Sequence, residues 1–237
     1  MKNLLIEKSE DILTFILKNP AVFFSEADIQ ALFYERLREL DELKLLYDTG
    51  CSIGLNQYEN ESDKKYQTYA IHREYGLNNG KSSRVDLALL NPEDISSIAD
   101  PINLKDANNK YLTPDYIFEF GTDKSAKSCK SFYRHLLKDT EKLKFAKKRG
   151  YLIHVQRNYL RGKANNANKE KYDQYTAAIK RLSKNLPQNI NLLYFKVDVG
   201  GPKRLIKKEG KVKIFQNNSL EGTAQKNIEN EIRGLLQ

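Results

Sequence analysis

The sequence has no tryptophan, only two cysteines and only three histidines, and these shortages exclude several kinds of site. Cys51 and Cys129 are far apart and belong to no CxxC motif, so neither a disulfide framework nor a zinc site is expected. His72, His135 and His154 are scattered, which argues against a histidine-rich metal centre. A GxGxxG motif is absent as well, so dinucleotide binding is disfavoured.

Long apolar runs are also missing. No stretch approaches the roughly 18 residues that a membrane-spanning helix needs, and charged side chains interrupt the first 20 residues. The same segment lacks the apolar stretch and the small-residue cleavage site of a signal peptide. We therefore expect a cytoplasmic protein with no membrane partner.

Positive charge is what the chain has in excess. It carries 40 Lys and Arg against 31 Asp and Glu, which gives a net charge of +9. This excess favours a polyanionic partner, because basic side chains that neutralise phosphates release counterions. Charge alone does not distinguish DNA from RNA or from a membrane surface. Hydrophobic residues make up 40% of the chain, which is typical of a folded domain.

Hydrophobic periodicity predicts one α/β domain over residues 1–237, with a central mixed β-sheet flanked by helices. The predicted strands are 66–75, 83–90, 115–121, 150–156, 191–199 and 211–216, and the predicted helices are 1–20, 25–47, 125–148, 170–184 and 221–237. The polar segments 49–65, 92–113 and 157–170 are predicted to be loops, the first of them a possible hairpin tip. The last helix either packs on its own core or pairs two subunits into a homodimer.

Two predicted strands each carry an acidic residue at the centre of an apolar run, Asp86 in one and Glu119 in the other. Burying a carboxylate costs several kcal/mol unless it is paired or bound to a metal. Two carboxylates on neighbouring strands would also repel one another. A divalent cation with oxygen ligands and waters resolves both conflicts. For either residue alone an ion pair with Arg84 or a lysine is favoured, whereas for the two together we favour a metal site.

The order of these motifs resembles the PD-(D/E)XK nuclease superfamily. RVDLALL is similar to its first acidic strand, IFEFG to the strand of the (D/E)XK motif, and SEADIQALFYERL to its leading helix. The resemblance covers about residues 22–156 and leaves 157–237 as a C-terminal α/β extension. It implies a restriction-endonuclease-like core with the order αβββαβ.

The resemblance also implies an activity. It predicts a Mg²⁺-dependent endonuclease, with Mn²⁺ as a possible substitute, that hydrolyses phosphodiester bonds of double-stranded DNA as restriction or defence enzymes do. Asp86, Glu119 and the backbone carbonyl of Phe120 would hold the metal.

The sequence departs from the family at Gly121, which stands where the motif has a lysine. That lysine is thought to position the attacking water and to stabilise developing charge. Some family members supply the amine from a neighbouring element, and Lys124 and then Lys127 are the candidates here. The alternatives are a fold that has lost catalysis and acts as a nucleic-acid-binding or assembly module, or a protein that acts on RNA.

Further site candidates come from the flanking elements. Glu26 lies on the same helical stripe as Gln30 and either joins the site or stabilises the helix dipole. Glu74 and Gln156 are ranked lower, with a cross-strand ion pair and an ordinary strand-end glutamine as their alternatives. Contacts to nucleic-acid phosphates are predicted for basic residues of helix 125–148 and of the loop after 156, namely Lys127, Lys130, Arg134, Arg157, Arg161 and Lys163. A solvated charged surface is the alternative for this set.

Overall fold

The structure is a computed structural model that describes residues 8, 11–12, 14–16, 25–52, 64–78, 83–122, 128–157, 165–198, 201–208 and 211–216. For the described residues within 156–172 and 195–216 only the backbone is described. Its helices are α2 (Glu26–Leu37), α3 (Asp41–Lys44), α4 (Cys129–Leu143), α5 (Asn165–Ser183) and the 3-10 helix η1 (Pro92–Ser97). The strands are β1 (Tyr47–Ser52), β2 (Lys65–Thr68), β3 (Ile71–Gly76), β4 (Arg84–Leu89), β5 (Ile98–Asp100), β6 (Lys105–Asp106), β7 (Tyr116–Thr122), β8 (Arg149–Arg157), β9 (Ile190–Asp198), β10 (Gly201–Lys208) and β11 (Lys211–Gln216).

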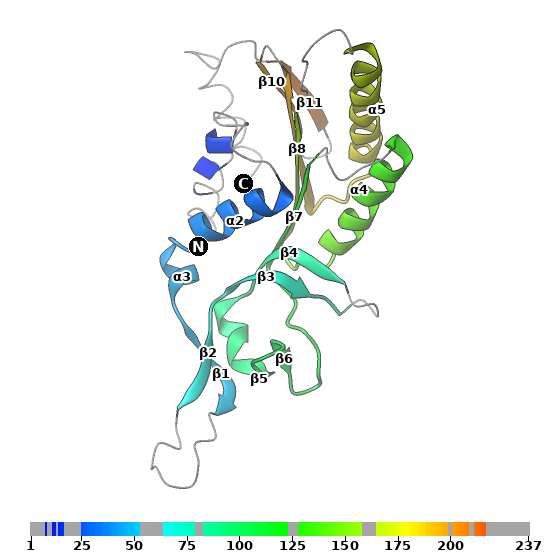
Figure 1. The fold of residues 1–237 in the computed structure, drawn as a ribbon. Helices are drawn as coiled ribbons and strands as arrows, with labels where there is room; N and C mark the ends of the chain where they lie inside the picture. The colour runs from blue at the N-terminus through cyan, green and yellow to red at the C-terminus, as the bar shows by residue number, and fades with distance from the viewer. Residues whose placement is uncertain are drawn as a thin grey trace.

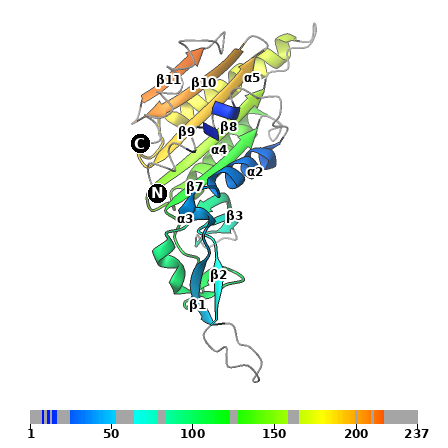
Figure 2. The same cartoon turned by 90° about the vertical axis from the view of Figure 1, so that its left-hand side faces the viewer.

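The main sheet has seven strands in the order β11-β10-β9-β8-β7-β4-β3. β7, β8 and β9 run parallel, and every other pairing in this sheet is antiparallel. Helix α2 covers one face, whereas α4 and α5 lie side by side on the other (Figure 1). Figure 2 shows the same sheet face-on, with β9 to β11 extending it beyond β8. The mixed α/β sheet flanked by helices that the sequence predicts is therefore confirmed.

Helix α2 begins where the sequence predicts. The Ser25 hydroxyl accepts a hydrogen bond from the Asp28 N–H at 3.2 Å, and the Asp28 carboxylate accepts one from the Ser25 N–H at 2.7 Å. This capping box satisfies two backbone donors that a helix start leaves unpaired. Phe33 then packs its ring 4.9 Å from that of Phe120 on β7. The cap and this contact together fix the first turn of α2, with Glu26, beside the sheet.

Helix α4 lies on the opposite face of the sheet. Ser128 caps it, and Phe132, Leu136 and Leu143 are buried against the strands. The ring of Phe132 also lies 4.5 Å from that of Tyr175 on α5. In the described part of the chain, no helix has both the length and the apolar content to cross a membrane.

A smaller lobe lies beyond the β3–β4 end of the main sheet. It consists of the antiparallel pairs β1–β2 and β5–β6 together with η1 (Figure 1). Strand β1 packs against η1 and β5. The lobe therefore inserts, in two pieces, into the order of helices and strands that builds the main sheet.

Two elements predicted as continuous are broken. The helix predicted over 25–47 ends at Leu37, and the backbone of Leu40 is extended before the short helix α3. The strand predicted over 66–75 divides into β2 and β3, which belong to different sheets. Ala70 lies at this break, where its carbonyl accepts the Leu90 N–H at 2.7 Å. Tertiary contacts override local propensity at both points.

Helix α4 is shorter than the predicted 125–148. It ends at Leu143 because the N–H groups of Lys147 and Lys148 donate to the carbonyls of Pro114 and Asp115 before β7, instead of continuing the helix.

Other boundaries also differ from the predictions. The predicted loop 49–65 contains the end of β1 and the first residue of β2. The predicted loop 92–113 contains all of η1, β5 and β6, and the predicted loop 157–170 contains the start of α5. Strand β10 was missed, because its Gly-Pro start and its four lysines and arginines are not typical of a central strand. In the N-terminal segment, residues 8, 11–12 and 14–16 are helical. The predicted helix 221–237 lies outside the described residues.

Gly121 is required by the packing of His154. The two residues are neighbours in the β7–β8 register, and a Cβ added at Gly121 would lie 2.5 Å from Nδ1 of His154. The imidazole is 1% exposed, stacks on Tyr194 and meets Phe132 edge-on. Burial lowers the pKa of His154 to about 3, so the ring is neutral at physiological pH. A larger residue at position 121 would therefore force the His154 ring to shift.

We predict that Gly121→Ala lowers the free energy of unfolding by about 1–3 kcal/mol, because the added methyl group overpacks this space. In a His154→Ala background the same change should cost close to nothing, since the ring that it meets is gone. Urea denaturation of the four proteins of this double-mutant cycle measures the coupling. An equal cost of Gly121→Ala in both backgrounds would contradict the packing argument.

Candidate active site

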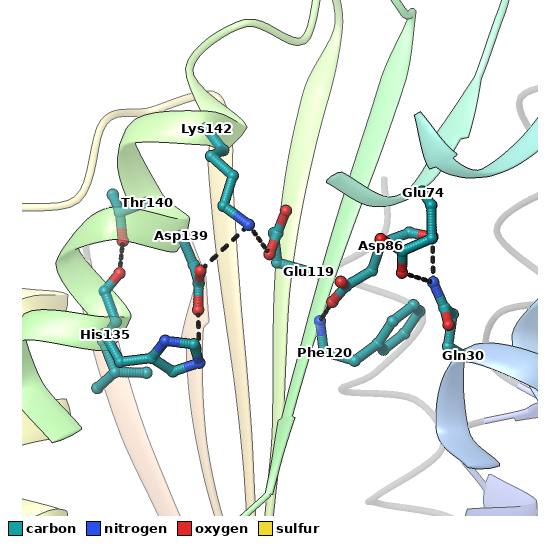
Figure 3. Close-up of polar contacts among 10 residues, drawn as sticks. Gln30, Glu74, Asp86, Glu119, Phe120, His135, Asp139, Thr140 and Lys142 are labelled. Atoms are coloured by element: carbon teal, nitrogen blue, oxygen red, sulfur yellow. Dashed lines mark hydrogen bonds and ion pairs between the residues drawn. The ribbon is translucent and has the colours of Figure 1, made fainter. Parts of the chain in front are cut away.

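Glu119 lies at the middle of β7 and is 2% exposed. Its side chain points toward α4, where Lys142 Nζ lies 2.6 Å from Oε2 (Figure 3). The other oxygen, Oε1, is buried and has no hydrogen-bond partner among the described residues. Burial, together with the negative charges of Asp86 and Asp139, raises the pKa of Glu119. The ammonium of Lys142 thus compensates this carboxylate only in part.

Asp86 stands where β4 and β7 separate. The two strands pair from Leu89↔Tyr116 to Leu87↔Phe118, and no further. At the next position the Asp86 carboxylate accepts the N–H of Phe120 at 2.7 Å. Burial raises the pKa of Asp86 to about 6, although this hydrogen bond and Lys142 act in the opposite direction. Asp86 therefore replaces a backbone acceptor at the edge of β7, next to Glu119.

Gln30 connects α2 to the antiparallel strands β3 and β4. Its amide nitrogen donates to a carboxylate oxygen of Glu74 at 3.0 Å and to the carbonyl of Asp86 at 2.5 Å. Arg73 donates in turn to the Gln30 side-chain oxygen at 2.9 Å. Glu74 lies between the β3–β4 pairs Arg73↔Leu87 and Tyr75↔Val85 and has a φ of 51°. A left-handed backbone costs about 1–2 kcal/mol for a residue other than glycine. Gln30 therefore holds a strained residue in place beside the site.

Glu26 belongs to the same cluster. It lies half-buried in the first turn of α2. Burial and the negative charges of Asp86 and Asp139 together raise its pKa to about 7. Stabilising the helix dipole, the alternative role of Glu26, favours the ionised form. The raised pKa reflects burial first and the neighbouring carboxylates second, which together outweigh the charge of Lys142.

Sequence analysis did not assign Lys142 and Asp139 to the site. Lys142 Nζ lies 3.4 Å from Asp139 Oδ1 in addition to its contact with Glu119. Burial alone would lower the pKa of Lys142, but these carboxylates outweigh it and raise the pKa. A signal was present for Asp139, an acidic residue in the apolar stripe that Phe132 and Leu136 begin. Lys142 has no such signal, because it is one of many lysines in its helix.

The remaining predicted residues are not brought to this cluster by the described structure. Lys130 and Arg134 lie on the exposed side of α4. Gln156 and Arg157 end β8, where side chains are not described. The other predicted residues lie outside the described residues, and these are Lys124, Lys127, Arg161 and Lys163.

Within the described residues, no group of three or more His, Cys, Asp or Glu side chains could hold a metal ion as arranged. A Mg²⁺ site needs fewer, because this ion keeps several waters and binds one or two carboxylates. Asp86 and Glu119 fit that requirement. The unpartnered oxygen of Glu119 and the raised pKa values of Glu26, Asp86 and Glu119 mark uncompensated negative charge that a cation would offset.

Comparisons of the chain with protein-family models, with curated proteins and with solved structures gave no match. Its function must therefore be inferred from the residues of the site.

We predict that Glu26→Gln makes the metal-free protein more stable at pH 8 but leaves its stability unchanged near pH 4. The pKa of Glu26 is about 7 in the folded state against an ordinary value of 4.5. Between these values the unfolded chain loses the proton and the folded chain keeps it, so stability falls as pH rises. The variant lacks this loss.

Urea denaturation in EDTA at a series of pH values measures the effect. Glu35→Gln is the matched control, because Glu35 is an exposed carboxylate on the same helix. The same pH dependence for both variants would remove Glu26 from the cluster.

Proposed function

We propose that this chain is a metal-dependent endonuclease that hydrolyses DNA phosphodiester bonds with a site of the PD-(D/E)XK type. The observation that carries the proposal is the contact of 2.6 Å between Lys142 Nζ and Glu119. The motif requires an amine beside its second carboxylate, and Gly121 cannot provide one. Lys142 supplies it from α4, on the face toward which Glu119 points. Lys142 thereby replaces Lys124 and Lys127 as the catalytic lysine of the proposal.

The order of elements supports a restriction-endonuclease-like core. Helix α2, strands β3, β4 and β7, helix α4 and strand β8 follow one another in the expected αβββαβ order. The smaller lobe and strands β9 to β11 are additions to that core. The acidic residues lie on the second and third core strands, as the resemblance requires.

Four side chains of the cluster have a role in the proposed reaction. Asp86 and Glu119, with the carbonyl of Phe120, would hold Mg²⁺, which when bound polarises the scissile phosphate and lowers the pKa of a water. Lys142 would offset the negative charge that develops on the phosphate oxygens. Glu26 would accept the proton that the attacking water loses, since a base with a pKa near 7 is suited to that task. The water oxygen forms the new bond to phosphorus as the P–O bond to the leaving sugar breaks.

The outer side of α4 supports DNA as the substrate. Lys130, Arg134 and Lys138 recur every four residues, are exposed and have no ion-pair partner among the described residues. By contrast, Lys144, which follows the last residue of α4, and Lys148, which precedes β8, are paired with carboxylates. A row of uncompensated cations that leads toward Lys142 suits a phosphate backbone.

The first test is cleavage of supercoiled plasmid and linear duplex DNA with Mg²⁺ or Mn²⁺. We expect cleavage by the wild-type protein, none in EDTA or with Glu119→Ala, and a rate about 10²–10³-fold lower with Lys142→Ala, the cost of losing one charge-stabilising donor. Lys144→Ala is the matched control from the C-terminal end of the same helix, and its rate should stay within a few fold of wild type.

Two outcomes would contradict this assignment. Retained DNA binding without cleavage under any metal would favour the binding-module alternative. Normal cleavage by Lys142→Ala, with loss of cleavage in Lys124→Ala or Lys127→Ala, would return the catalytic amine to the segment after β7.

We further predict that Lys130→Ala and Arg134→Ala each weaken DNA binding, and that each reduces the slope of log K against log salt by about 1. Binding to labelled duplex in EDTA at several salt concentrations measures the slope, and competition with duplex RNA tests the nucleic acid. Lys44→Ala removes an exposed lysine that pairs with Asp41 on α3, and it should leave the slope unchanged. Slopes for the two α4 variants equal to that of Lys44→Ala would show that α4 does not contact DNA.

A further inference from the structure

The proposed reaction leaves one buried carboxylate of the cluster without a role. Asp139 is 3% exposed and lies in the stripe of α4 that faces the sheet, between Leu136 and Leu143. An ionised side chain in such a stripe is costly unless it is paired. Its neighbours therefore indicate what it does.

Asp139 is held between two basic side chains of its own helix. Its Oδ1 lies 3.4 Å from Lys142 Nζ, and its Oδ2 lies 3.3 Å from His135 Nε2 (Figure 3). His135 precedes Asp139 by four residues and Lys142 follows it by three, so all three share one side of α4. One oxygen of the carboxylate thus lies beside the ammonium and the other beside the imidazole, whose Nε2 makes no hydrogen bond among the described residues.

Lys142 therefore has two anionic partners with different duties. Glu119, the nearer one at 2.6 Å, is also a proposed ligand of the cation. A carboxylate that shares its charge with a divalent cation attracts an ammonium less strongly. Asp139 has no such second duty. A lysine side chain has four rotatable bonds and is strongly hydrated, so without an anchor it would turn toward solvent.

We propose that Asp139 is a positioning residue, which keeps the Lys142 ammonium beside the site while Glu119 is engaged by the cation. This inference rests on the proposed function, because it assigns a role within that reaction. Asp139 itself touches neither substrate nor metal. It acts through Lys142 alone.

The chain offers a matched control on the same helix. Glu141 Oε1 lies 2.6 Å from Lys144 Nζ, again three residues apart, but on the exposed side. Glu141→Gln therefore removes one charge and one lysine contact at the same spacing as Asp139→Asn does. A role of Asp139 in helix stability alone would give both variants the same behaviour at the site.

The experiment measures how fast an amine-acetylating reagent labels Lys142, by peptide mass spectrometry of the folded proteins in EDTA. Glu119→Gln removes the nearer partner without any metal. We expect slow labelling of Lys142 in this variant, labelling several-fold faster in Glu119→Gln/Asp139→Asn, and slow labelling in Glu119→Gln/Glu141→Gln. Thermal unfolding of each variant confirms that it is folded. The proposal would be overturned if Lys142 were labelled as fast in Glu119→Gln as in Glu119→Gln/Asp139→Asn.

Kinetics separate this inference from the proposed function. If the wild-type protein cleaves DNA, Asp139→Asn should lower kcat about 10–100-fold, as loss of a supporting partner does. The KM for DNA and the affinity for Mg²⁺ should stay unchanged. Asp139→Glu should restore part of the rate, and Glu141→Gln should match wild type. If the wild-type protein cleaves DNA and Asp139→Asn is equally active, the positioning role is overturned but the proposed function is not. Absence of Mg²⁺ binding and cleavage in wild type would overturn the proposed function, while the labelling in EDTA still decides whether Asp139 holds Lys142.

Discussion

Glu119 is buried at the middle of β7, where an ionised carboxylate costs several kcal/mol unless a counter-charge lies close to it. The ammonium of Lys142 supplies that charge, and it reaches Glu119 only because α4 packs along β7 and β8. The pairing is incomplete, since one oxygen of Glu119 has no partner among the described residues and Asp86 adds a second negative charge nearby. The fold therefore carries a charge imbalance at its centre, which is costly for stability and which a cation would relieve.

Gly121 and Lys142 are two consequences of one packing arrangement. His154 fills the space beside Gly121 on the face of the sheet that α4 covers. A lysine at position 121 would collide with that ring, so any amine for Glu119 has to approach from the helix. Under the proposed function, Gly121 thus indicates that the catalytic lysine is supplied by α4 instead of by β7. It does not by itself indicate lost catalysis.

The strands of the site could be predicted because each is a short apolar run with clear ends, such as Asn91-Pro92 after β4. Asp86 and Glu119 were identifiable as charges placed inside those runs. The contact between Lys142 and Glu119 was not predictable. Helical periodicity shows which side of α4 is apolar, but it does not show which residues of α4 lie beside which residues of β7. The break at Ala70 depends in the same way on a long-range contact, its hydrogen bond from Leu90. Local patterns therefore predicted the elements, and packing decided which charges meet.

The charge of the site also opposes that of the whole chain. The net charge is +9, yet Glu26, Asp86, Glu119 and Asp139 surround one ammonium. A nucleic acid would be attracted by the basic side of α4 and repelled by the carboxylates beside it. Under the proposed function, a cation at those carboxylates would make the centre attractive to phosphate. The same imbalance that destabilises the metal-free fold would then make productive binding depend on the metal, so that stability, metal binding and substrate binding depend on one group of carboxylates.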